Sequence, residues 1–223
     1  AAQADLHLVI AHDLATLDDQ FFRSDLWEKH ISTIAYILKY NLMSVDKRPD
    51  DIGYYCNLAI DKIPSLRPRE LRVSEASLVK KHYHALKIAS QLSVPTLVLE
   101  DDALIVNPQG LASFCLAKEV ANRFTDLCTD FPLKGRGEPA QIVDREGKAH
   151  QVLRLTRAHT RTTCAYLVSP DVAMALTRSF WPCSLPADLH LQYLLEMHGI
   201  AGIWAKGTYI KHLSKSGQFQ SVI

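Results

Sequence analysis

Three consecutive acidic residues, Glu100, Asp101 and Asp102, directly follow an apolar run at residues 97–99. Neighbouring carboxylates raise one another's pKa values unless a cation neutralises them. A hard divalent cation such as Mg²⁺ or Mn²⁺ does this, and it also bridges the oxygens of a phosphate substrate. The cluster therefore predicts a metal and phosphate site. The alternative is a solvated loop whose acids cap a helix or pair with Arg and Lys, and the apolar residues 103–106 that follow disfavour it.

These acids stand at the end of a predicted strand, and ligands of an open α/β sheet bind beyond the carboxyl ends of its strands. On an extended chain, residues i and i+2 point to the same side. We therefore expect Glu100 and Asp102 to face the site together, while Asp101 points back into the scaffold.

Alternating strands and helices surround the acidic cluster. The predicted strands are 6–12, 96–99 and 162–168, the predicted helices are 24–42, 74–94, 110–128, 169–180 and 186–199, and a hairpin covers 141–155. The unalternating apolar run at 96–99 is typical of a parallel strand buried on both faces. This order predicts an α/β fold with a mainly parallel, Rossmann-like sheet, flanking helices and a small β-hairpin. The length of 223 residues fits one domain over 1–223.

Cap and turn residues mark the ends of several of these elements. Ser169 followed by Pro170 predicts the N-cap and the first residue of a helix. Ser74 is the expected N-cap of the helix that precedes the acids. Gly147 predicts the turn of the hairpin, and Gly199 ends the last helix.

Composition and charge exclude several classes of protein. Lys and Arg number 25 and Asp and Glu number 24, so a net charge of +1 does not indicate a nucleic-acid-binding protein. Five cysteines without a CxxC spacing predict reduced thiols in a cytoplasmic protein, with Cys164 and Cys183 as packing residues. No apolar run approaches the roughly 20 residues of a membrane helix. The first residues lack the regions of a signal peptide. Peripheral association with the inner face of a membrane stays open.

Four segments, in order, resemble glycosyltransferase family 25 of the lipopolysaccharide-biosynthesis type. They are SEASLVKKHYHALKIASQLSVPTLVLEDDALI at 74–105, TTCAYLVSPDVAMAL at 162–176, LPADLHL at 185–191 and QSVI at 220–223. The resemblance covers roughly residues 70–223. It implies a GT-A fold, in which a Rossmann-like domain binds a nucleotide-sugar and transfers the sugar to an acceptor hydroxyl. Residues 10–13, IAHD, replace the family's Asn-Leu-Asp-Arg-like turn, so the identity of the donor nucleotide is not implied.

The resemblance also implies roles for the acidic motif and for the helix before it. Asp102 would be a ligand of Mn²⁺ or Mg²⁺, and Glu100 and Asp101 would contact the donor. Ser77 and His82 match the family's helix block and would bind the donor as well. His82 also lies on the apolar stripe of its helix, a position typical of a hydrogen-bonded core histidine.

Further implied roles fall on residues that follow the motif. GT-A enzymes often complete the metal site with a C-terminal histidine, which would be His212. Asp188 lies in the family's Pro-x-Asp segment and is the candidate base that takes the acceptor's proton. The alternative is that Asp188 is only a helix N-cap. Thr163 and Lys211 would bind the donor, although an exposed lysine is as often only solvated.

The expected function is therefore metal-dependent sugar transfer in the synthesis of a bacterial surface polysaccharide such as lipopolysaccharide or capsule. The expected partners are a nucleotide-sugar donor and a glycan or lipid-linked acceptor, and not a nucleic acid. Two alternatives remain: a Mg²⁺-dependent phosphoryl-transfer or hydrolase domain, and a non-catalytic module that binds a nucleotide-sugar.

Overall fold

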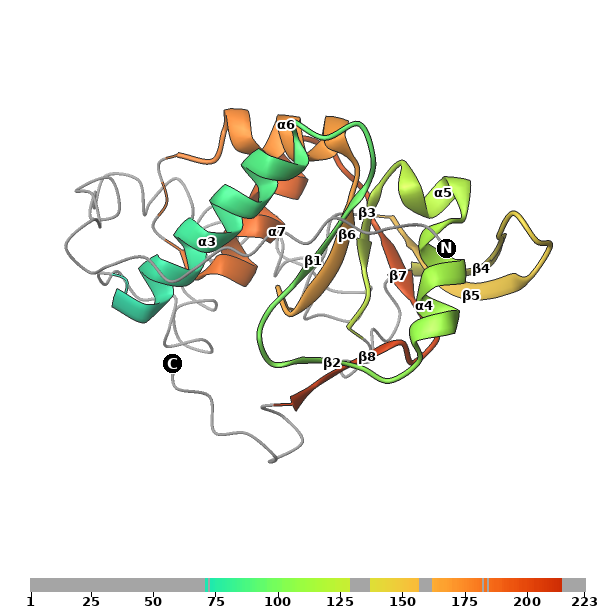
Figure 1. Cartoon of the computed structure of the whole chain (residues 1–223). Helices are drawn as coiled ribbons and strands as arrows, with labels where there is room; N and C mark the ends of the chain where they lie inside the picture. Colours follow the sequence, from blue (N-terminus) through green and yellow to red (C-terminus); the bar gives the residue numbers. More distant parts are fainter. Residues whose placement is uncertain are drawn as a thin grey trace, which may run out of the picture.

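The structure, a computed structural model, describes residue 71 and residues 73–128, 137–156, 162–181, 183 and 185–213. The predicted strand at 6–12 and the predicted helix at 24–42 lie outside these residues. Figure 1 shows the described chain as a central sheet with helices on both sides.

The sheet has six strands in the order β1-β6-β3-β7-β5-β4. They are β1 (Thr96–Leu99), β3 (Phe124–Asp126), β4 (Gly137–Val143), β5 (Ala149–Leu155), β6 (Ala165–Val168) and β7 (Ile203–Ala205). Among these described strands β3 and β7 run parallel, and every other neighbouring pair is antiparallel. The fold is α/β as expected, but the described strands form a mixed sheet and not a mainly parallel one.

The difference arises because the order of elements along a chain does not determine the direction of each strand. β4 and β5 are joined by the short turn at 144–148, which permits only antiparallel pairing. Within the described sheet β1 is an edge strand, and its last residue, Leu99, is exposed. Its apolar run is therefore not the mark of a strand buried on both faces. β6 is buried along its whole length, as expected for the second strand.

A separate two-stranded ribbon lies at one end of the sheet (Figure 1). It pairs β2 (Ala103–Ile105) with β8 (Ile210–His212) in antiparallel register. The tight turn that joins β1 to β2 carries the three acids, and the register sets Ala103 opposite His212. The chain therefore brings its acidic motif and its last described histidine to the same place.

Three helices cover one face of the sheet: α3 (Val73–Ala89), α6 (Pro170–Arg178) and α7 (Ala187–Met197). The short helices α4 (Pro108–Cys115) and α5 (Lys118–Ala121) lie on the other face. Alternate residues of β6 point to the two faces: Tyr166 and Val168 join the core under α3, and Ala165 and Leu167 join the core under α4. β6 is therefore packed against a hydrophobic core on each of its two faces.

The local signals in the sequence match the ends of several elements. Ser169 Oγ accepts a hydrogen bond from the backbone N–H of Val172 at 3.4 Å, and Pro170 is the first residue of α6. Gly147 has φ +84° in the hairpin turn, and Gly199 has φ +62° after α7. These positive φ angles cost little only for glycine, which explains the residue type at both places.

Two predicted helices differ from the observed ones. α3 begins at Val73, so Ser74 lies in its first turn and is not its N-cap. Residues 110–128 do not form one helix, because the chain leaves α4 at Leu116, forms the short α5 and then enters β3. None of the described helices combines the length and the apolar character needed to cross a membrane.

Candidate functional site

The antiparallel pairing of β1 and β6 creates the candidate site. Leu99 lies opposite Ala165, so the end of β1 meets the start of β6. The backbone N–H of Glu100 donates to the carbonyl of Cys164 at 2.8 Å, and the Thr163 hydroxyl donates to the Glu100 carboxylate. Glu100 is therefore a direct neighbour of Thr163 and Cys164, which lie about 60 positions later in the chain.

The three acids do not continue the strand but form a turn. The N–H of Ala103 donates to the carbonyl of Glu100 at 3.2 Å, which closes the turn. Glu100 and Asp102 have side chains that are only 14% and 20% exposed, whereas Asp101 is exposed. The expectation that Asp101 points back into the scaffold is therefore wrong, because alternation of side chains holds for an extended strand and not for a turn.

His82 holds the Glu100 carboxylate in place from α3. Its Nε2 lies 3.1 Å from Glu100 Oε1, and its Nδ1 lies 3.1 Å from the Tyr166 hydroxyl. A carboxylate only accepts hydrogen bonds, so Nε2–H donates to Glu100 and, in the neutral ring, Nδ1 accepts from Tyr166. His82 is 5% exposed and both its nitrogens are engaged. The observed position matches the core-histidine alternative and makes His82 a positioning residue for Glu100.

Glu100 is ionised at neutral pH in this setting. Burial alone would raise its pKa, but the hydrogen bond and electrostatic influence of His82, the hydrogen bond of the Thr163 hydroxyl and the electrostatic influence of His212 together lower its pKa below the ordinary value. Tyr166 shifts in the other direction, since burial and the Glu100 charge raise its pKa. The hydroxyl therefore stays protonated and remains a donor to His82.

Asp102 and His212 lie together across the β2–β8 ribbon. Asp102 Oδ2 is 3.4 Å from His212 Nδ1, and the N–H of Leu213 donates to the Asp102 carbonyl at 2.9 Å. Asp102 Oδ1 is buried and has no hydrogen-bond partner among the described residues. An orphaned carboxylate oxygen beside an imidazole is the environment in which a divalent cation would satisfy both groups.

A third donor atom completes the group. Asp102, Cys164 and His212 each offer one ligand atom, and these atoms lie within 4.8 Å of one another. Carboxylate suits Mn²⁺ and Mg²⁺, whereas imidazole and thiolate suit softer ions such as Zn²⁺. The Asp102–His212 pair therefore suits the expected Mn²⁺ better than Mg²⁺. The Cys164 thiol is a further possible ligand that was not expected from the sequence.

Cys164 is buried, as expected for a packing residue, but its sulfur also belongs to this group. A hydrogen bond with Cys128, then burial, then the charges of Cys128, Asp102 and Glu100 raise the pKa of the Cys164 thiol. The described cysteines Cys115, Cys164 and Cys183 are free thiols, as expected.

Asp188 lies in the first turn of α7, near Glu100. Its Oδ1 accepts from the N–H of Leu189 at 2.9 Å, while the N-cap position belongs to Pro186. Burial raises the pKa of the Asp188 carboxyl, the backbone hydrogen bonds oppose this, and the charges of Glu100 and Glu75 raise it further. Asp188 is therefore not the N-cap of its helix, and a carboxyl with a raised pKa is suited to exchanging protons.

Other residues expected in the site are less closely placed. Ser77 is half-buried on α3. Lys211 is exposed on β8 and, as the neighbour of His212 in a strand, points to the other face of the ribbon. Arg154 on β5 pairs with Glu119 at 2.8 Å, and residues 157–161, which include Arg157 and Arg161, lie outside the described residues. The structure therefore brings together Glu100, Asp102, Thr163 and His212, with Asp188 within electrostatic reach.

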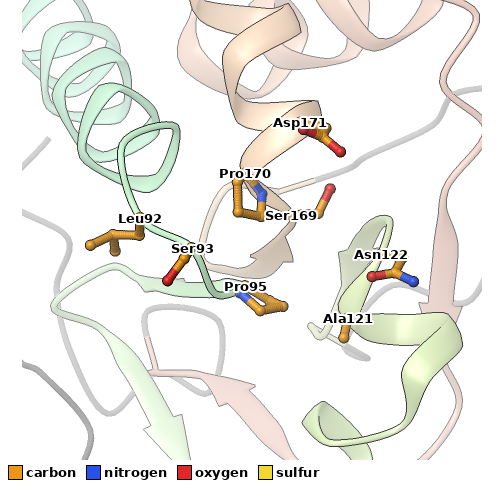
Figure 2. Close-up of a pocket in the computed structure, with 8 residues that line it drawn as sticks. All are labelled: Leu92, Ser93, Pro95, Ala121, Asn122, Ser169, Pro170 and Asp171. Carbon is orange, nitrogen blue, oxygen red and sulfur yellow. The ribbon is translucent and has the colours of Figure 1, made fainter.

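A cavity of about 390 Å³ lies elsewhere (Figure 2). Its lining includes Pro95, just before β1, and Ser169, Pro170 and Asp171 at the start of α6. These residues mark the opposite ends of β1 and β6 from Glu100 and Cys164. The cavity is therefore not part of the acidic site.

A second polar cluster connects α4 to the β4–β5 hairpin. The Ser113 hydroxyl donates to Asp144 Oδ2 and lies 3.1 Å from His150 Nε2, which is itself 3.2 Å from Asp144 Oδ2. The Tyr209 hydroxyl lies 2.9 Å from His150 Nδ1. A catalytic triad needs serine and aspartate on opposite ring nitrogens, and here both meet Nε2. This cluster is therefore a buried structural network.

Comparisons with known proteins give no family for this chain: no protein-family model matches it, and no curated protein shows a significant match.

Proposed function

We propose that this protein is a metal-dependent glycosyltransferase of GT-A architecture, which moves a sugar from a nucleotide-sugar to an acceptor hydroxyl during synthesis of a bacterial surface polysaccharide. One observation carries the proposal. The segments that resemble glycosyltransferase family 25 lie apart in the sequence, yet their residues Glu100, Asp102, Thr163 and Asp188 lie near one another in the fold. His212 lies beside Asp102 in the same group. With a nucleotide-sugar donor and a glycan or lipid-linked acceptor, the proposed reaction would take place in the cytoplasm, at the inner face of the membrane.

Each residue of the group has a task in this reaction. Asp102 and His212 would hold the cation, which when bound neutralises the leaving nucleotide diphosphate. Glu100, fixed by His82 and Thr163, would present a carboxylate that is ionised at neutral pH to donor hydroxyls. Burial raises the pKa of Asp188, and the charge of Glu100 adds to this effect. Asp188 accepts the proton of the acceptor hydroxyl as that oxygen attacks the sugar, a step that a positioned carboxylate accelerates by about 10²–10⁴-fold.

A donor screen tests the proposal. The full chain is incubated with UDP-, GDP- and CMP-sugars, with and without Mn²⁺, and released nucleotide is measured. We expect release from one donor class that depends on the cation and is lost in Asp102→Ala. Glu146→Gln, at an exposed carboxylate in the hairpin turn, is the matched control and should keep full activity.

The same screen distinguishes the alternatives. Release of phosphate from simple esters, with no dependence on a nucleotide, would favour a Mg²⁺-dependent hydrolase. Nucleotide binding without turnover of any donor would favour a binding module. Full activity in Asp102→Ala would contradict the assignment of the metal site.

A further inference from the structure

We propose that Cys164 is the third protein ligand of the cation held by Asp102 and His212, and that the site therefore prefers a thiophilic divalent ion such as Zn²⁺ or Co²⁺ to Mg²⁺. This inference deepens the proposed function, because it concerns the cation site on which that function rests. Its test measures metal binding directly and needs no sugar donor.

The spacing of the donor atoms carries the first step. In a tetrahedral zinc site with Zn–N and Zn–O near 2.0–2.1 Å and Zn–S near 2.3 Å, ligand atoms lie roughly 3.3–3.7 Å apart. Asp102 Oδ2 and His212 Nδ1 are 3.4 Å apart, which is within this range. The Cys164 sulfur lies within 4.8 Å of one ligand atom of Asp102 and one of His212. A movement on the order of an ångström therefore closes the site around an ion.

The second step is that all three ligands stand on fixed backbone. Cys164 is held by its own carbonyl, which accepts from Glu100, and by its N–H, which donates to Thr162 Oγ1 at 3.0 Å. Asp102 is held by the turn before β2, and His212 by its pairing with Ala103. Sites built on strands hold their ligands more precisely than sites on loops. His212 lies in β8, and Asp102 and Cys164 directly precede β2 and β6.

The third step is an unmet hydrogen bond. Asp102 Oδ1 is buried without a partner among the described residues, a situation that is costly for a carboxylate oxygen. An ion that binds both oxygens of the Asp102 carboxylate would satisfy Oδ1 while Oδ2 stays beside His212. Three protein ligands are also the number typical of catalytic zinc sites, in which water or substrate takes the fourth position.

The fourth step concerns the identity of the ion. Thiolate ligands select soft ions, and for a mixed site affinity rises from Mn²⁺ through Co²⁺ to Zn²⁺. Mg²⁺ instead demands oxygen ligands in an octahedral arrangement. As the metal–sulfur bond forms, the Cys164 thiol releases its proton to solvent, so one proton leaves for each ion bound at this ligand.

Cobalt titration tests the inference. The purified chain, stripped of metal with a chelator, is titrated with Co²⁺ while the near-ultraviolet absorption is recorded. We expect a thiolate-to-cobalt charge-transfer band that saturates, is abolished in Cys164→Ser, and is retained in Cys115→Ser. Cys115 is a matched control because it is also a free thiol but lies outside the site. Zn²⁺ should displace the cobalt, and excess Mg²⁺ should not.

A second variant covers the case in which Cys164→Ser fails to fold. His212→Ala keeps the thiol and should weaken Co²⁺ binding by at least about tenfold, the lower end of the loss seen when even an outer partner of a metal ligand is removed. No charge-transfer band in the wild-type protein, or a band of full intensity in folded Cys164→Ser, would overturn the inference.

The outcomes also separate this inference from the proposed function. A protein that shows the cobalt band but turns over no donor contradicts the proposed function alone. A protein that transfers sugar with Mn²⁺ but never shows the band contradicts this inference alone.

Discussion

Asp188 shows how one residue combines several physical effects at the candidate site. It is held near Glu100 and Glu75, and burial and both charges act to raise its pKa. A general base must be deprotonated to work, so the raised pKa moves the acid side of its working range toward neutral pH.

This argument predicts the pH dependence of the reaction. The rate of transfer should rise with pH through the Asp188 pKa, and Asp188→Asn should lower the rate by about 10²–10⁴-fold without preventing donor binding. Removing a neighbouring negative charge favours the ionised form. Glu75→Gln should therefore lower the Asp188 pKa and shift the acid limb of the pH–rate profile to lower pH. An acid limb that does not move, or moves to higher pH, would contradict the coupling of these carboxylates.

His82 offers a stability test of the positioning chain from Tyr166 to Glu100. Tyr166→Phe removes the hydroxyl that lies 3.1 Å from His82 Nδ1 and leaves that nitrogen buried without its donor. The expected loss is about 1–3 kcal/mol in the free energy of unfolding, measured by urea denaturation. Tyr83→Phe, on the helix α3 that also carries His82, is the control, since no hydrogen bond of the Tyr83 hydroxyl is described. Equal effects of the two substitutions would show that the buried hydroxyl does not support His82.

The acidic motif could be singled out from its residue types, and Asp188 and His212 from the resemblance to a known family. The structure places these residues near one another, and their roles stay predictions. Asp101 could not be placed correctly, because the prediction assumed a strand where the chain turns. Cys164 was assigned to packing because an apolar neighbourhood gives no sign of which side chains lie beside a buried thiol.

At the level of elements, the hairpin β4–β5 depends on the buried network around Asp144. The carboxylate accepts from Ser113, from His150 and from the backbone N–H groups of Glu146 and Lys148. The hydrogen bond from Ser113 has the largest effect on the Asp144 pKa, and burial acts in the opposite direction. Together with the other hydrogen bonds, the Ser113 hydrogen bond holds the pKa of Asp144 well below its ordinary value of 3.8. The hairpin is therefore stabilised by the ionised form of Asp144.

A depressed pKa fixes the sign of the pH effect. The stabilising contribution is complete above the unfolded pKa, near 3.8, and is lost as the pH falls below that value toward the lower folded pKa. Wild-type protein should therefore lose stability toward acid more steeply than Asp144→Asn, as measured by thermal unfolding at a series of pH values. Parallel losses in both proteins would contradict a stabilising role for the ionised carboxylate.

The cap at Ser169 and the turns at Gly147 and Gly199 were predictable because a single residue determines each, whereas the cap expected at Ser74 was wrong. Strand direction was not predictable in the same way. Whether β6 runs antiparallel to β1 depends on pairing between residues about 70 positions apart, as in the Leu99 to Ala165 register, and no local pattern encodes it. The consequence for the site is direct, since only this pairing places Thr163 and Cys164 beside Glu100.

At the scale of the whole molecule, the sheet separates two helical layers, and the candidate site occupies the end of the sheet next to the β2–β8 ribbon (Figure 1). The layered α/β class followed from the alternation of elements. The meeting of the β1–β2 turn, the start of β6, the start of α7 and the end of β8 is a tertiary property, and it turns scattered residues into one site.

The central claim is that this meeting point is a cation-dependent site for a nucleotide-sugar. Calorimetric titration of nucleoside diphosphates into the full chain, with and without Mn²⁺, tests it most directly. We predict binding of one nucleotide that requires the cation and is lost in Asp102→Ala while Glu146→Gln binds as the wild type does. Binding that is equally strong without a cation, or that survives in Asp102→Ala, would contradict the claim.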